Sequence, residues 1–158
     1  MTARAPADAA AMRLLPATSA DADRLLQWRN DPGTRAASHV GTEVSADEHR
    51  AWLARALADP NRRLWLAWCG DQAVGTVRAD RARGADGVAE TTLSWTIAPA
   101  WRGRGLGAAM LRLAVAQCSG PLRAEVRRGN AASQRLAEAA GLVLADRVGE
   151  TLHYRSPR

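Results

Sequence analysis

The chain of 158 residues contains no lysine and no phenylalanine, and it has only two cysteines and one tyrosine. Without lysine, no lysine base, nucleophile or Schiff base can take part in catalysis, and a Walker loop for nucleoside triphosphates is excluded. Cys69 and Cys118 have no metal-ligand spacing, so we expect free thiols in a reducing cytoplasm and no bound metal. No apolar run approaches the roughly 20 residues of a membrane span, and no signal peptide is recognisable. We therefore expect a cytoplasmic protein that does not bind membranes.

The formal net charge of +6 comes entirely from arginine. Because the arginines are scattered and form no basic run, we expect an anionic small-molecule ligand and no nucleic acid. Hydrophobic residues make up 47% of the chain and charged residues 24%, as in ordinary globular proteins. The length favours a single domain with a buried core, residues 12–158, preceded by a disordered tail, residues 1–11.

Hydrophobic periodicity and turn residues predict the order β-α-α-β-β-β-α-β-α-β-β, an α/β (α+β) chain with a mixed sheet and helices on its faces. The predicted strands are residues 12–15, 64–69, 73–79, 91–97, 122–127, 142–145 and 151–155. The predicted helices run from Ser19 to about Asn30, from Ser45 to Asp59, from Ala108 to Ala116 and from Ala131 to Ala140.

The most informative segment is Trp101–Gly107, between the strand 91–97 and the following helix. It has three glycines at alternate positions, flanked by Arg102 and Arg104. Backbone N–H groups at a helix N-terminus bind phosphate, and guanidinium groups suit phosphate oxygens. The segment therefore predicts a diphosphate-binding turn; the alternative is a turn whose glycines serve only tight packing.

A dinucleotide-binding fingerprint is a second interpretation of this segment, because Gly103, Gly105 and Ala108 fit it loosely. That fingerprint belongs in the first strand–helix turn of a repeated parallel unit. Here the segment follows strands that are predicted to be antiparallel, and only one crossover unit comes after it. We therefore reject the dinucleotide interpretation.

Two segments carry a resemblance to a known family. Arg102–Gly107 fits the pyrophosphate motif of the GNAT acetyltransferase superfamily, and Asn130–Leu142 fits that family's next motif, in order and at the expected separation. The chain resembles this superfamily over about residues 12–155, and its pattern is closest to amino-sugar or ribosomal-protein N-terminal acetyltransferases. The resemblance implies one acetyltransferase domain with a mostly antiparallel central sheet, helices on both faces and a splay between the strands 91–97 and 122–127.

The resemblance also implies acetyl-CoA (coenzyme A) as the cofactor, with its pyrophosphate on the backbone of residues 102–107 and its pantetheine arm beside the end of the strand 91–97. Asn130 and Ser133 are implied to flank the cofactor, although plain helix capping explains them equally well. The cofactor-binding residues are then Ile97, Ala98, Arg102, Gly103, Arg104, Gly105, Leu106, Gly107, Ala108, Asn130 and Ser133.

The catalytic acid and base of the family are replaced in this chain. The usual glutamate position holds Thr92, so we expect Glu90, on the same strand face, to act as base; the alternative is a solvated residue at the strand start. The usual tyrosine position holds Ala137, so Tyr154 is the candidate acid; the alternative is a partly buried structural residue. A thiol with a pKa near ~8.5 leaves tolerably without an acid.

The acceptor side is predicted from residues near the first two helices. Arginines there suit a phosphate or carboxylate, and tryptophans can stack on a base or sugar. Trp28 and Trp52 also fit the apolar faces of their helices, and His49 is expected at the surface. The predicted substrate-binding residues are Trp28, Arg29, Asn30 and Arg35.

These features favour an N-acetyltransferase that transfers acetyl to a primary amine of a small molecule by direct attack. An anionic acceptor such as a nucleotide-linked amino sugar is one candidate. One alternative is a protein N-terminal acetyltransferase of the ribosomal-protein type, and another is a non-catalytic acyl-CoA-binding regulatory module. An exposed late strand would allow a homodimer.

Overall fold

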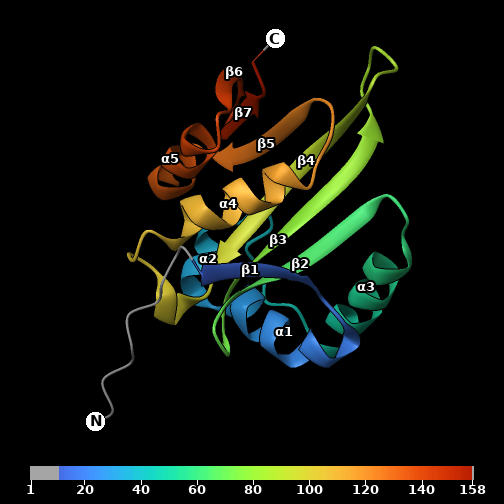
Figure 1. Cartoon of the computed structure of the whole chain (residues 1–158), viewed down its shortest axis with the longest axis vertical. Helices are drawn as coiled ribbons and strands as arrows, with labels where there is room; N and C mark the ends of the chain where they lie inside the picture. The colour runs from blue at the N-terminus through green and yellow to red at the C-terminus, as the bar shows by residue number, and fades with distance from the viewer. Residues whose placement is uncertain (1–10, 158) are drawn as a thin grey trace.

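The computed structural model describes residues 11–157 and contains a seven-stranded, mostly antiparallel sheet (Figure 1). Among the strands of the described residues, only β4 and β5 pair in parallel. The predicted fold class is therefore confirmed, whereas residues 1–10 of the predicted tail lie outside the described residues. Across the sheet the strands are β1 (Met12–Pro16), β2 (Arg62–Cys69), β3 (Gln72–Arg83), β4 (Ala89–Ile97), β5 (Leu122–Arg127), β7 (Thr151–Arg155) and β6 (Val143–Val148).

Helices cover both faces of this sheet. Trp52 of α3 lies over Arg78 on β3, whereas Met110 of α4 is close to Gly75 on the same strand. Because positions 75 and 78 point to opposite faces, α3 and α4 lie on opposite sides of the sheet; Figure 1 shows α4 in front of the strands. The helices are α1 (Ala22–Asn30), α2 (Pro32–Ala37), α3 (Ala46–Ala58), α4 (Leu106–Ala116) and α5 (Ala131–Ala139), with 3-10 turns at Ser19–Asp21 and Pro99–Trp101.

Helix α2 and the hairpin of β3 and β4 differ from the sequence prediction. The short helix α2 was not among the predicted elements; the Asp31 side chain accepts a hydrogen bond from the Thr34 N–H at its start, and Pro32 occupies the first helical position. The strands β3 and β4 are longer than the predicted strands 73–79 and 91–97, because β3 runs on to Arg83, which pairs with Ala89 of β4. The end of β3, residues 81–83, is exposed and contains two arginines, so it lacks the alternation of apolar and polar residues by which a strand is recognised in a sequence.

The strands β4 and β5 separate partway along their length. They pair only through Thr91, Thr92 and Leu93 of β4, which lie opposite residues 122–124 of β5. Beyond Leu93, β4 continues to Ile97 while paired with β3 alone. The predicted splay is therefore present, and backbone groups of residues 94–97 that face β5 are left without a strand partner.

The main core lies between the sheet and α4. Met110, Leu111 and Ala114 of α4 are fully buried in one cluster with Val77 and Leu93 of the central strands. This packing fixes the start of α4 at the end of β4, so the glycine turn and the splay lie next to each other. Among residues 11–157, no helix is long and apolar enough to cross a membrane.

Candidate active site

Two cavities meet at the splay between β4 and β5. The first, of about 580 Å³, lies along the glycine turn before α4 and is called the turn cavity below. The second, of about 530 Å³, lies between α1, α3 and the sheet and is called the helix cavity. Both cavities are lined by Trp95 and Thr96 of β4, so a ligand in one can reach a ligand in the other through the splay. The other shared residues are Ala37, Ser38, Asn130 and Ser133.

The glycines of the turn have two different roles. Gly103 (φ +74°) and Gly105 (φ +72°) adopt left-handed backbone conformations, and a Cβ atom at either position would project into open space. No side chain caps α4, so the N–H groups of its first turn are available to a ligand. Gly107 differs, because a Cβ there would lie 2.8 Å from the Leu136 methyl groups. A diphosphate therefore fits the first two glycines, whereas the third is required by tight packing between α4 and α5.

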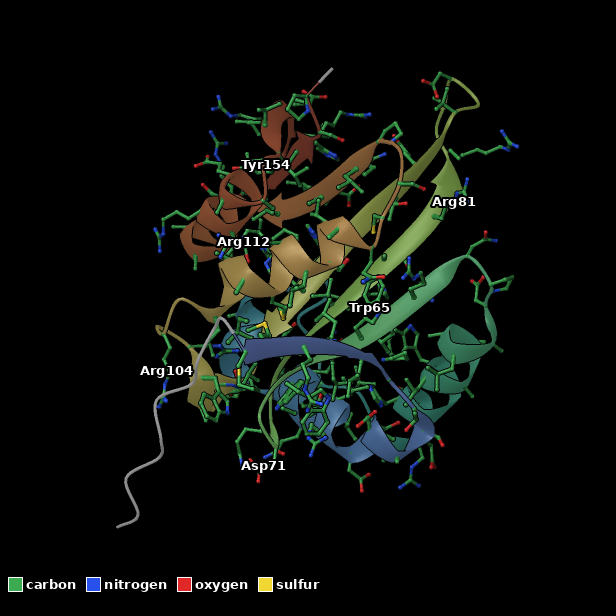
Figure 2. All side chains as sticks on the ribbon, in the orientation of Figure 1. Trp65, Asp71, Arg81, Arg104, Arg112 and Tyr154 are labelled. Carbon is green, nitrogen blue, oxygen red and sulfur yellow. The ribbon has the colours of Figure 1, made fainter. Side chains whose placement is uncertain are left out.

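The two arginines of the turn are engaged with the protein itself. Arg102 donates through Nη1 to Asp31 Oδ2 at 3.0 Å and through Nη2 to Thr34 Oγ1 at 2.7 Å. The Thr34 N–H, followed by Arg102, holds the pKa of the Asp31 carboxyl below its ordinary value. The exposed Arg104 guanidinium lies 4.8 Å from the Trp101 ring centre, on the outer side of the turn (Figure 2). Both side chains line the turn cavity, but Arg102 also ties the turn to α2.

Of the remaining predicted cofactor-binding residues, all line a cavity at the splay except Ala98 and Ala108. Asn130 Oδ1 accepts a hydrogen bond from the Ser133 N–H at 3.1 Å, which is the capping role given above as the alternative. Ser133 Oγ in turn accepts from Trp95 Nε1 at 3.2 Å. Ile97 and Leu106 line the turn cavity, whereas Ala98 and Ala108 line neither cavity.

The two predicted catalytic residues lie outside both cavities. Glu90 is at the far end of β4, where its Oε1 accepts from Arg123 at 2.9 Å and its Oε2 lies 3.5 Å from Arg155 Nη1. Tyr154, labelled in Figure 2, is 2% exposed, and burial, followed by the charge of Glu138, raises its pKa. The predicted base is therefore a structural ion-pair residue, and the predicted acid is a core residue.

The predicted substrate-binding residues divide into two groups. Trp28 and Arg29 line the helix cavity. Asn30 and Arg35 line neither cavity. Their side chains instead form hydrogen bonds with the loop between α2 and α3, residues 38–45. Asn30 exchanges two hydrogen bonds of 2.8 Å with the Val44 backbone, and Arg35 donates to the Gly41 carbonyl at 3.1 Å.

Arg29 has a hydrogen-bond partner at one terminal nitrogen and none at the other. Its Nη2 donates to the Val40 carbonyl oxygen at 2.7 Å, but its Nη1 is buried and has no hydrogen-bond partner. No carboxylate within residues 11–157 forms an ion pair with it. The helix cavity therefore contains a guanidinium whose charge the described part of the protein does not neutralise.

His49 lines the helix cavity, and the expectation that it lies at the surface is wrong. It is 5% exposed, lines the helix cavity and lies 5.6 Å from the Trp52 ring, centre to centre. Burial, followed by the charge of Arg29, lowers the pKa of its imidazole. The spacing of His49, Leu53 and Ala56 is that of one buried helix face, and this pattern is the signal that would have identified it.

Comparison with known proteins places this geometry in a family. Residues 12–143 match the family model described as acetyltransferase (GNAT) domain. The aminoglycoside acetyltransferase AAC(6')-Ib, solved with paromomycin and acetyl-CoA, has a TM-score of 0.82 at 17% identity over 94% of each chain. No curated protein matches the chain in sequence.

Two further solved structures have the same fold. An acetyltransferase from Thermus thermophilus has a TM-score of 0.76 at 26% identity, over 93% of this chain and 97% of the other. The spermidine N-acetyltransferase from Vibrio cholerae, solved with CoA and spermine, has a TM-score of 0.78 at 14% identity, over 92% and 94% of the two chains.

Proposed function

This chain belongs to the acetyltransferase (GNAT) domain family, and we propose that it transfers acetyl to a small primary amine that carries a carboxylate or phosphate. As a family member it is an acetyl-CoA-dependent N-acetyltransferase, so the alternative of a non-catalytic binding module is set aside. The observation that carries the proposed acceptor class is the buried Arg29 Nη1, which has no partner beside the helix cavity.

The turn cavity is the proposed donor site. Acetyl-CoA, when bound, supplies the acetyl group as a thioester, which an amine can attack directly. The open space at Gly103 and Gly105 and the uncapped start of α4 suit the pyrophosphate. The unpaired backbone of β4 beyond Leu93 offers hydrogen bonds to the amides of the pantetheine arm.

The helix cavity is the proposed acceptor site. Its volume of about 530 Å³ is within the usual range for sites that hold a small molecule. A buried guanidinium nitrogen without a hydrogen-bond partner is costly, so Arg29 Nη1 favours an acceptor with an anionic group and disfavours a polycation such as spermine. Trp52 and Trp28 line the same cavity, where an aromatic ring can contact a sugar or base, and Trp28 also packs in the core, as the alternative interpretation predicted. A nucleotide-linked amino sugar has all of these features.

Acetylation of a protein N-terminus is the alternative acceptor chemistry. The side chains of Asn30 and Arg35 fasten the loop 38–45 beside the helix cavity at both Val44 and Gly41. A fastened loop favours a small molecule over an extended peptide, which would need an open groove. Association into a homodimer through the exposed edge strand β6 stays a prediction, to be checked by light scattering.

The test combines donor binding with acceptor specificity. Acetyl-CoA should raise the melting temperature of the protein, and thiol release should then be measured with a matched panel of amines. The panel contains amino sugars with and without a phosphate or nucleotide, an amino acid, spermine and peptides with free N-termini. Faster release with the anionic members supports the proposal. Preference for spermine or for peptides would contradict the proposed acceptor class, and absence of release with any amine would contradict the transferase activity itself.

A further inference from the structure

The buried imidazole of His49 in the helix cavity has a ring nitrogen with no hydrogen-bond partner among the described residues. Side-chain polar atoms that are buried normally have a hydrogen-bond partner, yet His49 Nδ1 has none. The ring contacts Trp52, with the two planes inclined by 40°, and it lines the cavity in which the acceptor is proposed to bind. A catalytic role would explain why this nitrogen has no partner within the protein.

Contacts of α3 show which part of β4 lies beside His49. Just beyond the C-terminus of α3, Asp59 lies 3.8 Å from Arg62 Nε, and the same Nε lies 3.3 Å from Asp80 Oδ1. Asp80 is opposite Thr92 in the pairing of β3 with β4. The end of α3 is therefore level with the early part of β4, far from the splayed end.

The helix then runs back toward the splay. Trp52 lies over Arg78, which is opposite Ser94, two residues further along β4. His49 is about one helical turn before Trp52, or about 5 Å further in the same direction. This step brings it toward the level of Thr96, a residue that lines both cavities.

The other candidate bases around the helix cavity are less suited. The carboxylate of Glu125 accepts from Arg123 at 3.3 Å and lies 3.8 Å from His153 Nδ1, so it is already paired. Glu48 and His39 are exposed to solvent. The charged and titratable groups that face the cavity are Arg29 from α1, Glu48 from α3, Arg78 from β3, His39 from the loop 38–45, and Glu125 and Arg127 from β5.

We infer that His49 takes up the proton that the acceptor amine loses during acetyl transfer, a role that rests on the proposed function. The amine nitrogen uses its lone pair to bond to the acetyl carbon, and the carbon–sulfur bond breaks with its electron pair remaining on sulfur. The proton released by nitrogen moves to the His49 imidazole, and it returns through solvent to the sulfur. The products are the amide and the free thiol, so atoms and charge balance.

The surroundings of His49 suit a proton acceptor. Burial, followed by the nearby positive charge of Arg29, lowers its pKa from the ordinary histidine value, so the imidazole is neutral at pH 7. A neutral imidazole has the lone pair that a general base requires.

The principal test compares His49→Gln with the control His153→Gln, because His153 lines neither cavity. A positioned general base contributes about 10²- to 10⁴-fold, so kcat should fall at least about 100-fold in His49→Gln. The dissociation constant of acetyl-CoA, measured by calorimetry, should be unchanged. The wild type and His153→Gln should lose kcat/KM on acidification with one inflection below pH ~6.5, and His49→Gln should lose this inflection.

Two further measurements do not depend on turnover of the glutamine variant. In the NMR titration of the free protein, the resonance that His49→Gln removes should titrate below the ordinary histidine value of about 6.5 and shift when the acceptor binds. In His49→Ala, added imidazole should restore turnover. A glutamine variant with kcat within about threefold of wild type and the same pH profile would overturn the role of His49 alone. A wild-type enzyme that acetylates no amine would overturn the proposed function and this role together.

Discussion

Replacement of Gly105 by alanine separates the cost of backbone strain from the loss of a phosphate site. Gly105 has φ +72°, and a Cβ atom there would meet no protein atom within 4 Å. Gly87, in the hairpin between β3 and β4, has φ +78° and equally open surroundings, but it lines neither cavity. The two glycines therefore form a matched pair that differs in whether a ligand is expected nearby.

Strain should be similar in the two variants. A left-handed conformation costs an alanine about 1–2 kcal/mol, and no clash adds to this cost at either position. Each variant should therefore lose about 1–2 kcal/mol of unfolding free energy in urea titrations. The melting temperature should fall by about 3 °C for each kcal/mol in a chain of this size.

Binding of acetyl-CoA should differ sharply between the variants. In Gly105→Ala the methyl group enters the proposed phosphate space and removes at least one hydrogen bond to a charged group, worth about 1.5–3 kcal/mol. The dissociation constant should then rise by about tenfold or more. At a concentration 100 times the wild-type constant, the stabilisation by acetyl-CoA should fall from about 2.7 to about 1.4 kcal/mol. Calorimetry that gives equal affinities for Gly105→Ala and Gly87→Ala would refute the phosphate site at this turn.

Three further predictions concern single side chains. Arg29→Gln should raise the acceptor KM about 10- to 100-fold without changing acetyl-CoA affinity, because the unpartnered Nη1 is lost. The control Arg35→Gln removes only a loop hydrogen bond, and equal KM values in steady-state kinetics would contradict this role for Arg29. Glu90→Gln should retain kcat and its pH profile while losing up to about 1 kcal/mol of stability, because the ion pair with Arg123 is lost; a large drop in kcat would restore Glu90 as a base. The lowered pKa of His49 means that the unfolded chain binds a proton at higher pH than the folded one, so this residue's contribution to stability is lost as pH falls through about 6.5. Urea unfolding at pH 7.5 and 5.5 should show a smaller decrease in stability in His49→Gln than in the wild type, and equal decreases would argue against a buried neutral imidazole.

The fold and the glycine turn before α4 could be predicted from the sequence because they depend on local signals. Glycines at 103 and 105 mark a turn that needs left-handed backbone, and Asn130 marks the cap of the next helix. These signals act over a few residues, so a single sequence reveals them. The order of strands and helices likewise follows from hydrophobic periodicity and from turn residues.

Polar side chains whose partners lie far away along the chain were predicted less well, on the donor side and on the acceptor side. Arg102 was expected to face a phosphate, but it pairs with Asp31, which lies 71 positions away along the chain. Asn30 was expected to bind substrate, but it holds the Val44 backbone. Polar side chains of this kind have several chemically equivalent partners, and only the tertiary arrangement selects one of them. His49 is different, because the apolar face of its helix was visible in the sequence.

The division of lining residues between the two cavities bears on how such an enzyme acquires new substrates. The side chains of α1 and α3 line only the helix cavity, and residues 101–107 line only the turn cavity. If the helix cavity is the acceptor site as proposed, substitutions at Trp28 and Trp52 should change the accepted amine while the proposed donor contacts stay intact. A library restricted to these two positions can be screened with one donor and one thiol assay, since every variant keeps the same acetyl-CoA chemistry. A change of acceptor specificity should therefore require substitutions only on α1 and α3.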